Sequence, residues 1–250
     1  MADQTPGFDI AGLVWPRRLP VAAGGGWIAR GFALQHRAPF KWTLLVVGYF
    51  VVSLGVAALP GVGIFLYPLL TPVWLAGLMH ACAMLSAGQP FALTMLFSGL
   101  RQRPASLLLA GALYLLGSAL STGLALVVYV ALTGGVDPAA LRELFDARSM
   151  PLALFALLVP MLMAGLGMLL LAMAFWFVPV LLMRHPIGVL AAIRLSFSAC
   201  AANLGAFVLW GLVALVAVVA GLLALGVGLL LVVPPLMASI YVAYREILAA

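Results

Sequence analysis

The chain has 250 residues, of which 66% are hydrophobic and only 7% are charged. Soluble domains carry about 25% charged residues, so twelve basic and six acidic side chains could not cover the surface of a water-soluble fold of this length. The composition therefore excludes a soluble globular domain, a disordered chain and a nucleic-acid-binding module, and a net charge of +6 in so apolar a chain indicates orientation in a membrane.

Six stretches are long enough to cross a hydrocarbon core about 30 Å thick, which requires about 20 apolar residues of helix. The fifth and sixth come from one unbroken apolar run, and we place the turn between them at Gly221–Gly226. The even-numbered spans each contain a proline, at Pro72, Pro179 and Pro235, which is expected to break or kink the helix. The predicted spans are residues 42–59, 63–85, 104–132, 151–183, 204–221 and 226–244.

A segment typical of a surface helix precedes each odd-numbered span. The clearest is Phe91–Arg103, in which Leu93, Leu96, Phe97 and Leu100 follow the i, i+3, i+4, i+7 rule. Segments Trp27–Arg37 and Ile187–Ala202 show the same pattern, and Pro39, Pro104 and Asn203 are the expected helix-start residues of the spans that follow. The apolar faces of these two segments are predicted to hold Trp27, Ile28 and Phe32, and Leu190, Ile193 and Phe197. The chain thus divides into three units, each a surface helix followed by a transmembrane hairpin.

The basic residues predict the orientation. If the N-terminus is cytoplasmic, ten of the twelve basic residues lie inside, and only Arg142 and Arg148 lie outside. We predict an all-α polytopic integral membrane bundle of six spans in three hairpins with interfacial amphipathic helices, both termini being cytoplasmic. Residues 1–23 would form a cytoplasmic tail and residues 24–250 a single membrane domain. In the outer loop, Asp137-Pro138 predicts a short helix. Its acidic residues Asp137, Glu143 and Asp146 form either a solvated helix face or an ion-binding lip.

The candidate functional residues are few. His80 is the one ionisable residue inside a predicted span, either as a gate or ligand or as a neutral histidine hydrogen-bonded near the interface. No acidic residue falls in a span, which argues against a proton-driven carrier. Cys82 and Cys200 are interpreted as small apolar residues, and we expect no catalytic, cofactor-binding or metal site. The candidate contacts with lipid headgroups are Arg30, Arg37, Arg101, Arg103 and Arg194.

Two short stretches carry a family resemblance. The run from Gly26 to Leu34 (GWIARGFAL), with Arg37-Ala38-Pro39-Phe40, resembles a family of uncharacterised six-span inner-membrane proteins of bacteria. More distantly, the three-unit plan looks like the membrane domain fused to some glycerophosphodiester phosphodiesterases. The catalytic phosphodiesterase domain has no counterpart in this sequence. The resemblance implies a membrane domain of the bacterial inner membrane and no catalytic residue.

These observations favour a protein without enzymatic activity that acts as a scaffold, a lipid-organising protein or an accessory subunit. Its expected partners are the bilayer, anionic headgroups on the cytoplasmic side, and a membrane protein or a second copy of the chain, but no nucleic acid. The alternative is a small-molecule transporter or channel in which the proline-containing even spans line the path. A transporter predicts a polar cavity between those helices, whereas a scaffold predicts a dry, closed bundle.

Overall fold

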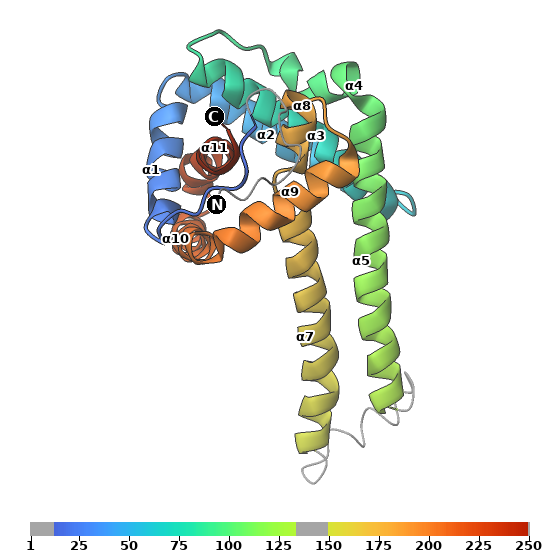
Figure 1. The fold of residues 1–250 in the computed structure, drawn as a ribbon. Coiled ribbons are helices and arrows are strands. Elements are labelled where there is room, and N and C mark those ends of the chain that lie inside the picture. Colours follow the sequence, from blue (N-terminus) through green and yellow to red (C-terminus); the bar gives the residue numbers. More distant parts are fainter. Residues whose placement is uncertain (1–12, 134–149, 250) are drawn as a thin grey trace, which may run out of the picture.

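The computed structural model describes residues 13–133 and 150–249, and this part of the chain is almost entirely helical (Figure 1). Its only β-type pairing is an isolated bridge between Leu13 and Ala249. The helices are Ala23–Gln35 (α1), Pro39–Ala57 (α2), Gly63–Ser86 (α3), the 3-10 helix Leu93–Phe97 (η1), Ser98–Gln102 (α4), Pro104–Thr133 (α5), Met150–Phe175 (α7), Val178–Arg184 (α8), Val189–Ala202 (α9), Leu204–Leu223 (α10) and Leu229–Leu248 (α11).

Within the described residues, six helical segments are long and apolar enough to cross a membrane, as predicted. The first helix begins at Pro39, the expected helix-start residue, because proline suits the first turn of a helix. The turn between the last two spans lies later than the predicted one, and it contains Leu225 and Gly226, both with positive φ. The predicted helix at Asp137, with Glu143 and Asp146, lies outside the described residues.

Of the even spans, which were expected to break or kink at their prolines, only the fourth is interrupted. Both α3 and α11 continue through their prolines, because a proline removes a single helical hydrogen bond and the next turn can resume. The fourth span is interrupted between α7 and α8, where Ser196 of α9 enters the hydrogen-bond ladder. Its Oγ donates to Met173 O (2.9 Å) and accepts from Phe177 N–H (3.0 Å), the two groups that an unbroken helix would pair directly.

The surface segments depart from their predicted faces. Phe91–Arg103 is not one helix but η1 followed by α4, and of its four predicted apolar residues only Leu96 is buried. In α9 the side that packs on the protein carries Leu195 and Ser196, whereas Leu190 and Phe197 are exposed. An apolar face of a surface segment can contact lipid as well as protein, so the pattern does not show which face packs on the protein. Small residues allow the closer contacts between helices.

Each surface segment packs on the even-numbered span of the preceding unit, and the first packs on the last. Gly31 of α1 lies directly against the Pro235 carbonyl of α11. At Gly99 of α4, an added Cβ would lie 2.7 Å from the Val73 carbonyl of α3. Ser196 of α9 bonds across the α7–α8 break. The three units are therefore linked in a closed ring (Figure 1).

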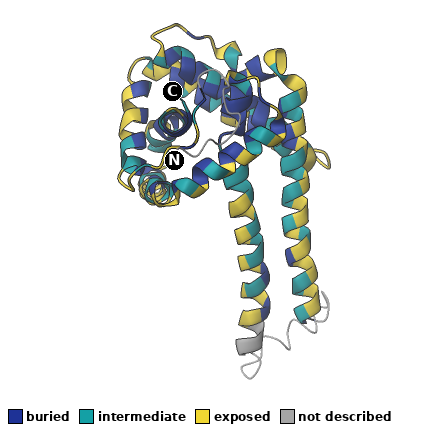
Figure 2. Ribbon diagram, in the orientation of Figure 1, coloured by how far each residue is buried: buried dark blue, intermediate teal, exposed yellow. Residues whose placement is uncertain are grey.

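The long helices α5 and α7 leave the compact part of the molecule side by side (Figure 1). They contact each other through small residues: Gly117 faces Leu171, and Ser121 faces Gly167. Apart from that seam, their outer halves are mostly exposed, and the buried residues concentrate in the compact part (Figure 2). Exposed side chains on these helices are mainly leucine, methionine and valine, as expected for a surface that faces lipid.

Candidate functional site

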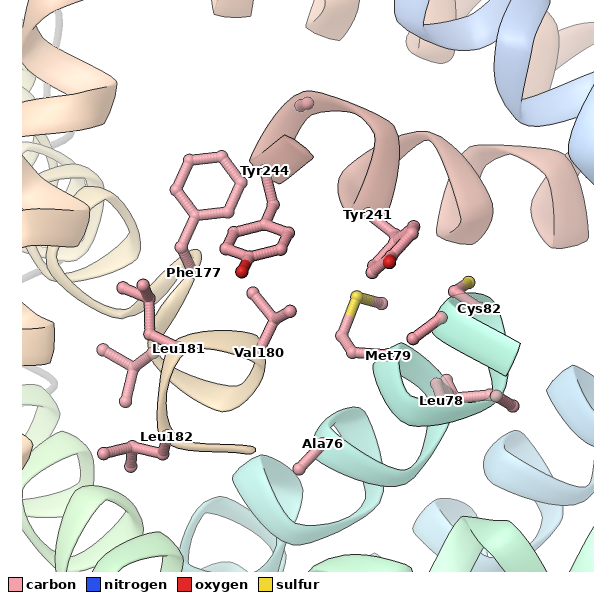
Figure 3. Close-up of a cluster of buried hydrophobic side chains, with 14 of the residues drawn as sticks. Ala76, Leu78, Met79, Cys82, Phe177, Val180, Leu181, Leu182, Tyr241 and Tyr244 are labelled. Atoms are coloured by element: carbon pink, nitrogen blue, oxygen red, sulfur yellow. The ribbon is translucent and has the colours of Figure 1, made fainter. Parts of the chain in front are cut away.

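The three even-numbered spans meet at one place in the compact part. Met79 of α3, Val180 of α8, and Tyr241 and Tyr244 of α11 point toward one another and fill the space between the helices (Figure 3). All four side chains are buried, at most 3% exposed. This closed apolar cluster separates two kinds of cavity, one apolar and one basic.

The apolar cavity has a volume of about 300 Å³ and lies between α2, α3, α5, α7, α8 and α11. Its walls include Pro68, Pro72 and Pro179, and its hydroxyl groups come from Thr71 and two tyrosines. The Thr71 hydroxyl already donates to the Tyr67 carbonyl. The lining of the cavity between the even spans is therefore mostly apolar.

On the other side of the cluster lie two adjoining cavities of about 490 Å³ each, which share Ser86, Tyr241, Arg245 and Ala249. We call them together the basic cleft. Its charged lining residues are Arg17, Arg30, Arg37, Arg184, Arg245 and Glu246. Arg184 ends α8 and Arg245 lies in the last turn of α11, so the cleft opens at the ends of two spans.

The single carboxylate of the cleft is already paired. Arg30 Nη2 lies 2.7 Å from Glu246 Oε1, and Trp27 Nε1 donates to Glu246 Oε2 at 3.0 Å. Arg37 Nη1 donates to the carbonyls of Leu85 and Ser86 at the end of α3, which fixes its guanidinium at the rim. Because Glu246 is the only acidic residue in the described ranges, the other arginines of the cleft keep their charge uncompensated there.

The floor of the second cavity is a hydrogen-bonded aromatic pair. His185 Nε2 and the Tyr244 hydroxyl are 2.6 Å apart, both residues being buried. At the boundary between the cavities, Ser86 Oγ and the Tyr241 hydroxyl are 3.4 Å apart. The cleft thus combines cationic walls with hydroxyl groups, a lining suited to an anion with several oxygen atoms.

The arginines predicted to contact headgroups lie in three different environments. Arg30 and Arg37 lie in the basic cleft. Arg101 of α4 and Arg194 of α9 are exposed elsewhere. Arg103 donates to the carbonyls of His185 (3.4 Å) and Ile187 (3.1 Å) and so ties the start of α5 to the α8–α9 connection.

His80 is half-buried on α3 and lines none of these cavities. Arg17, Arg184 and Arg245 were not predicted as site residues from the sequence. Two of them, Arg184 and Arg245, lie near the ends of even spans. Cations are common at helix C-termini in general, so this position alone does not indicate a site.

The two cysteines behave as small buried side chains. Both are free thiols, and burial raises the pKa of Cys200 to about 12, so this thiol stays protonated at neutral pH. Within residues 13–133 and 150–249, no three His, Cys, Asp or Glu side chains gather as metal ligands would.

Comparisons with known proteins agree with a membrane location. No family model matches the chain, and no solved structure matches it. The chain is 30% identical, over 200 residues, to a probable inner membrane protein of Burkholderia thailandensis, and the match covers 74% of this chain and 70% of the relative. With six helices able to cross a membrane, this chain is a multi-pass integral protein of the inner membrane. It belongs to the same family as that probable inner membrane protein.

Proposed function

We propose that the protein organises lipids or acts as a scaffold or accessory subunit, without enzymatic activity, and that its surface segments lie among anionic headgroups. The observation that carries this proposal is the pairing of outward apolar side chains with arginine. On α9, Leu190 (63% exposed) and Phe197 flank Arg194, and on α4, Leu100 adjoins Arg101. Exposed leucine beside exposed arginine suits the boundary between acyl chains and headgroups.

The proposed orientation places both termini and the three surface segments on the cytoplasmic side, with the spans arranged as three hairpins. Ten basic residues against two support it. A fluorescent protein fused after Ala250 is expected to be bright in cells, and a periplasmic alkaline phosphatase fused at the same place is expected to be inactive. An active phosphatase with a dark fluorescent fusion would contradict this orientation.

The headgroup role is tested by the lipids that the purified protein retains. We expect native mass spectrometry after mild extraction to show bound phosphatidylglycerol, and the double variant Arg101→Glu/Arg194→Glu to retain several-fold less, because two attractive charges become repulsive. Retention of phosphatidylethanolamine should not change. The matched control is Arg142→Glu/Arg148→Glu, which alters net charge equally in the predicted outer loop. Equal losses in both variants, or no loss in either, would count against surface-segment recognition.

A second candidate is a transporter for an apolar or amphipathic molecule, favoured by the break between α7 and α8 beside the apolar cavity. Uptake or flipping of a fluorescent lipid by reconstituted vesicles would favour transport. A flipping rate equal to that of protein-free vesicles would favour the scaffold.

A further inference from the structure

We propose that the basic cleft is a specific site for an anion carrying two phosphate groups, one in each cavity. This site lies apart from the exposed arginines of α4 and α9 that carry the proposed function. The proposed function is general contact with anionic headgroups, and the cleft would add selection of one class of ligand. This inference rests on the proposed function.

The charge of the cleft supports an anionic ligand of high valence. Five arginines and one glutamate line the two cavities, and these six residues carry a net charge of +4. Arg30 and Glu246 neutralise each other at 2.7 Å. Within the described part of the chain, Arg17 and Arg245 make no side-chain hydrogen bond or ion pair, so both are available to a ligand. Such a concentration of cations attracts anions to the cleft.

The division of the cleft supports two phosphates. The first cavity has Arg17, Arg30, Arg37 and Arg245 at its walls, and the second has Arg184 and Arg245. Arg245 is common to both cavities and can therefore contact both groups of one ligand. Guanidinium groups match phosphate oxygens in a two-pronged geometry, and the Ser86 and Tyr241 hydroxyls at the shared boundary add hydrogen-bonding groups.

The position of the cleft indicates how the ligand reaches it. The cleft opens where α8 and α11 end, and the ends of membrane-spanning helices are expected near the headgroups. Basic pockets between membrane helices are sites for multiply phosphorylated headgroups. A lipid with two phosphodiesters would fit this chemistry, and so would a soluble diphosphate that enters from the aqueous side. The shared chemistry is a pair of linked phosphates.

The test compares two pairs of substitutions in the full-length protein. Arg17→Gln/Arg245→Gln removes the two arginines that have no side-chain partner among the described residues, and Arg101→Gln/Arg194→Gln removes the same charge from the surface segments. Native mass spectrometry measures the binding of cardiolipin, which has two phosphodiesters, and of phosphatidylglycerol at matched phosphate concentration. Thermal unfolding in detergent with and without pyrophosphate tests a soluble diphosphate as the ligand. An unfolding midpoint equal to that of wild type without ligand shows that each variant is folded.

We expect wild-type protein to prefer cardiolipin, and the cleft variant to bind it at least ten-fold more weakly while the surface variant retains the preference. A pyrophosphate-dependent stabilisation that only the cleft variant loses, without preference for cardiolipin, would support the site with a soluble ligand. The site is overturned if the cleft variant binds cardiolipin and pyrophosphate as wild type does. Equal affinity for the two lipids, with no effect of pyrophosphate, overturns the two-phosphate assignment. Neither failure removes the headgroup role of the surface segments, which Arg101→Glu/Arg194→Glu tests separately.

Discussion

Gly31→Ala is expected to destabilise the protein by about 1–3 kcal/mol, the usual cost of forcing a methyl group into a filled interface. Gly31 lies on α1 where that helix meets α11, and an added Cβ would lie 2.9 Å from the Ser239 backbone nitrogen and closer still to the Pro235 carbonyl. Both neighbours are backbone atoms, which cannot rotate away. The measurement is the thermal unfolding midpoint of purified protein in detergent, compared with wild type.

Gly25→Ala is the matched control, because it makes the same chemical change in the same helix at a position with no atom within 4 Å of the added Cβ. Alanine favours the helix over glycine by up to about 1 kcal/mol, so this variant is expected to equal or exceed the stability of wild type. The two substitutions should therefore shift the midpoint in opposite directions. A shift of the same sign and size in both would mean that the contact between α1 and α11 does not depend on the glycine.

Asn203→Ala is expected to cost about 2–4 kcal/mol, because the asparagine connects three backbone groups that would be left without partners. Its Oδ1 accepts from Leu19 N–H at 2.8 Å, and its Nδ2 donates to the carbonyls of Arg17 (2.9 Å) and Ala199 (3.0 Å). The side chain is 2% exposed. Loss of the two bonds to residues 17 and 19 should also release the segment that precedes α1.

Two measurements check the Asn203 prediction. The unfolding midpoint should fall, and limited trypsin digestion should cut after Arg17 and Arg18 faster than in wild type. Ser198→Ala is the control, since its hydroxyl bonds only to the Arg194 carbonyl of its own helix, and it should change stability by less than about 0.5 kcal/mol. Unchanged digestion in the Asn203 variant would show that the N-terminal segment is held by other contacts.

The six spans could be predicted because hydrophobic length is a property of the sequence alone. Asn203 shows where that reasoning stops: the sequence identifies it as a residue that starts a helix, yet its side chain makes no cap hydrogen bond and instead bonds to Arg17 and Leu19. Ser196 is similar, since nothing in its local pattern indicates that it enters the backbone of another helix. These contacts join residues distant in sequence, so no local period reveals them.

The sequence likewise predicts only part of the candidate site. Arg30 and Arg37 were predicted from their place on a surface segment, and the structure places them in the basic cleft. Arg184 and Arg245 come from different spans and approach one another only because α8 and α11 end together. A sequence pattern can assign a charge to one end of a helix, but the grouping of such ends depends on how the helices pack.

The ring of contacts between units also sets an order for assembly. The chain is synthesised from its N-terminus, so α1 is in the membrane before α10 and α11, the helices that it packs against, have been made. Until then, its glycine face has no partner within the protein. The last helix to be synthesised therefore completes the packing of the first. A chain that stops before Leu229 would leave the α11-facing side of α1 exposed to chaperones and membrane proteases.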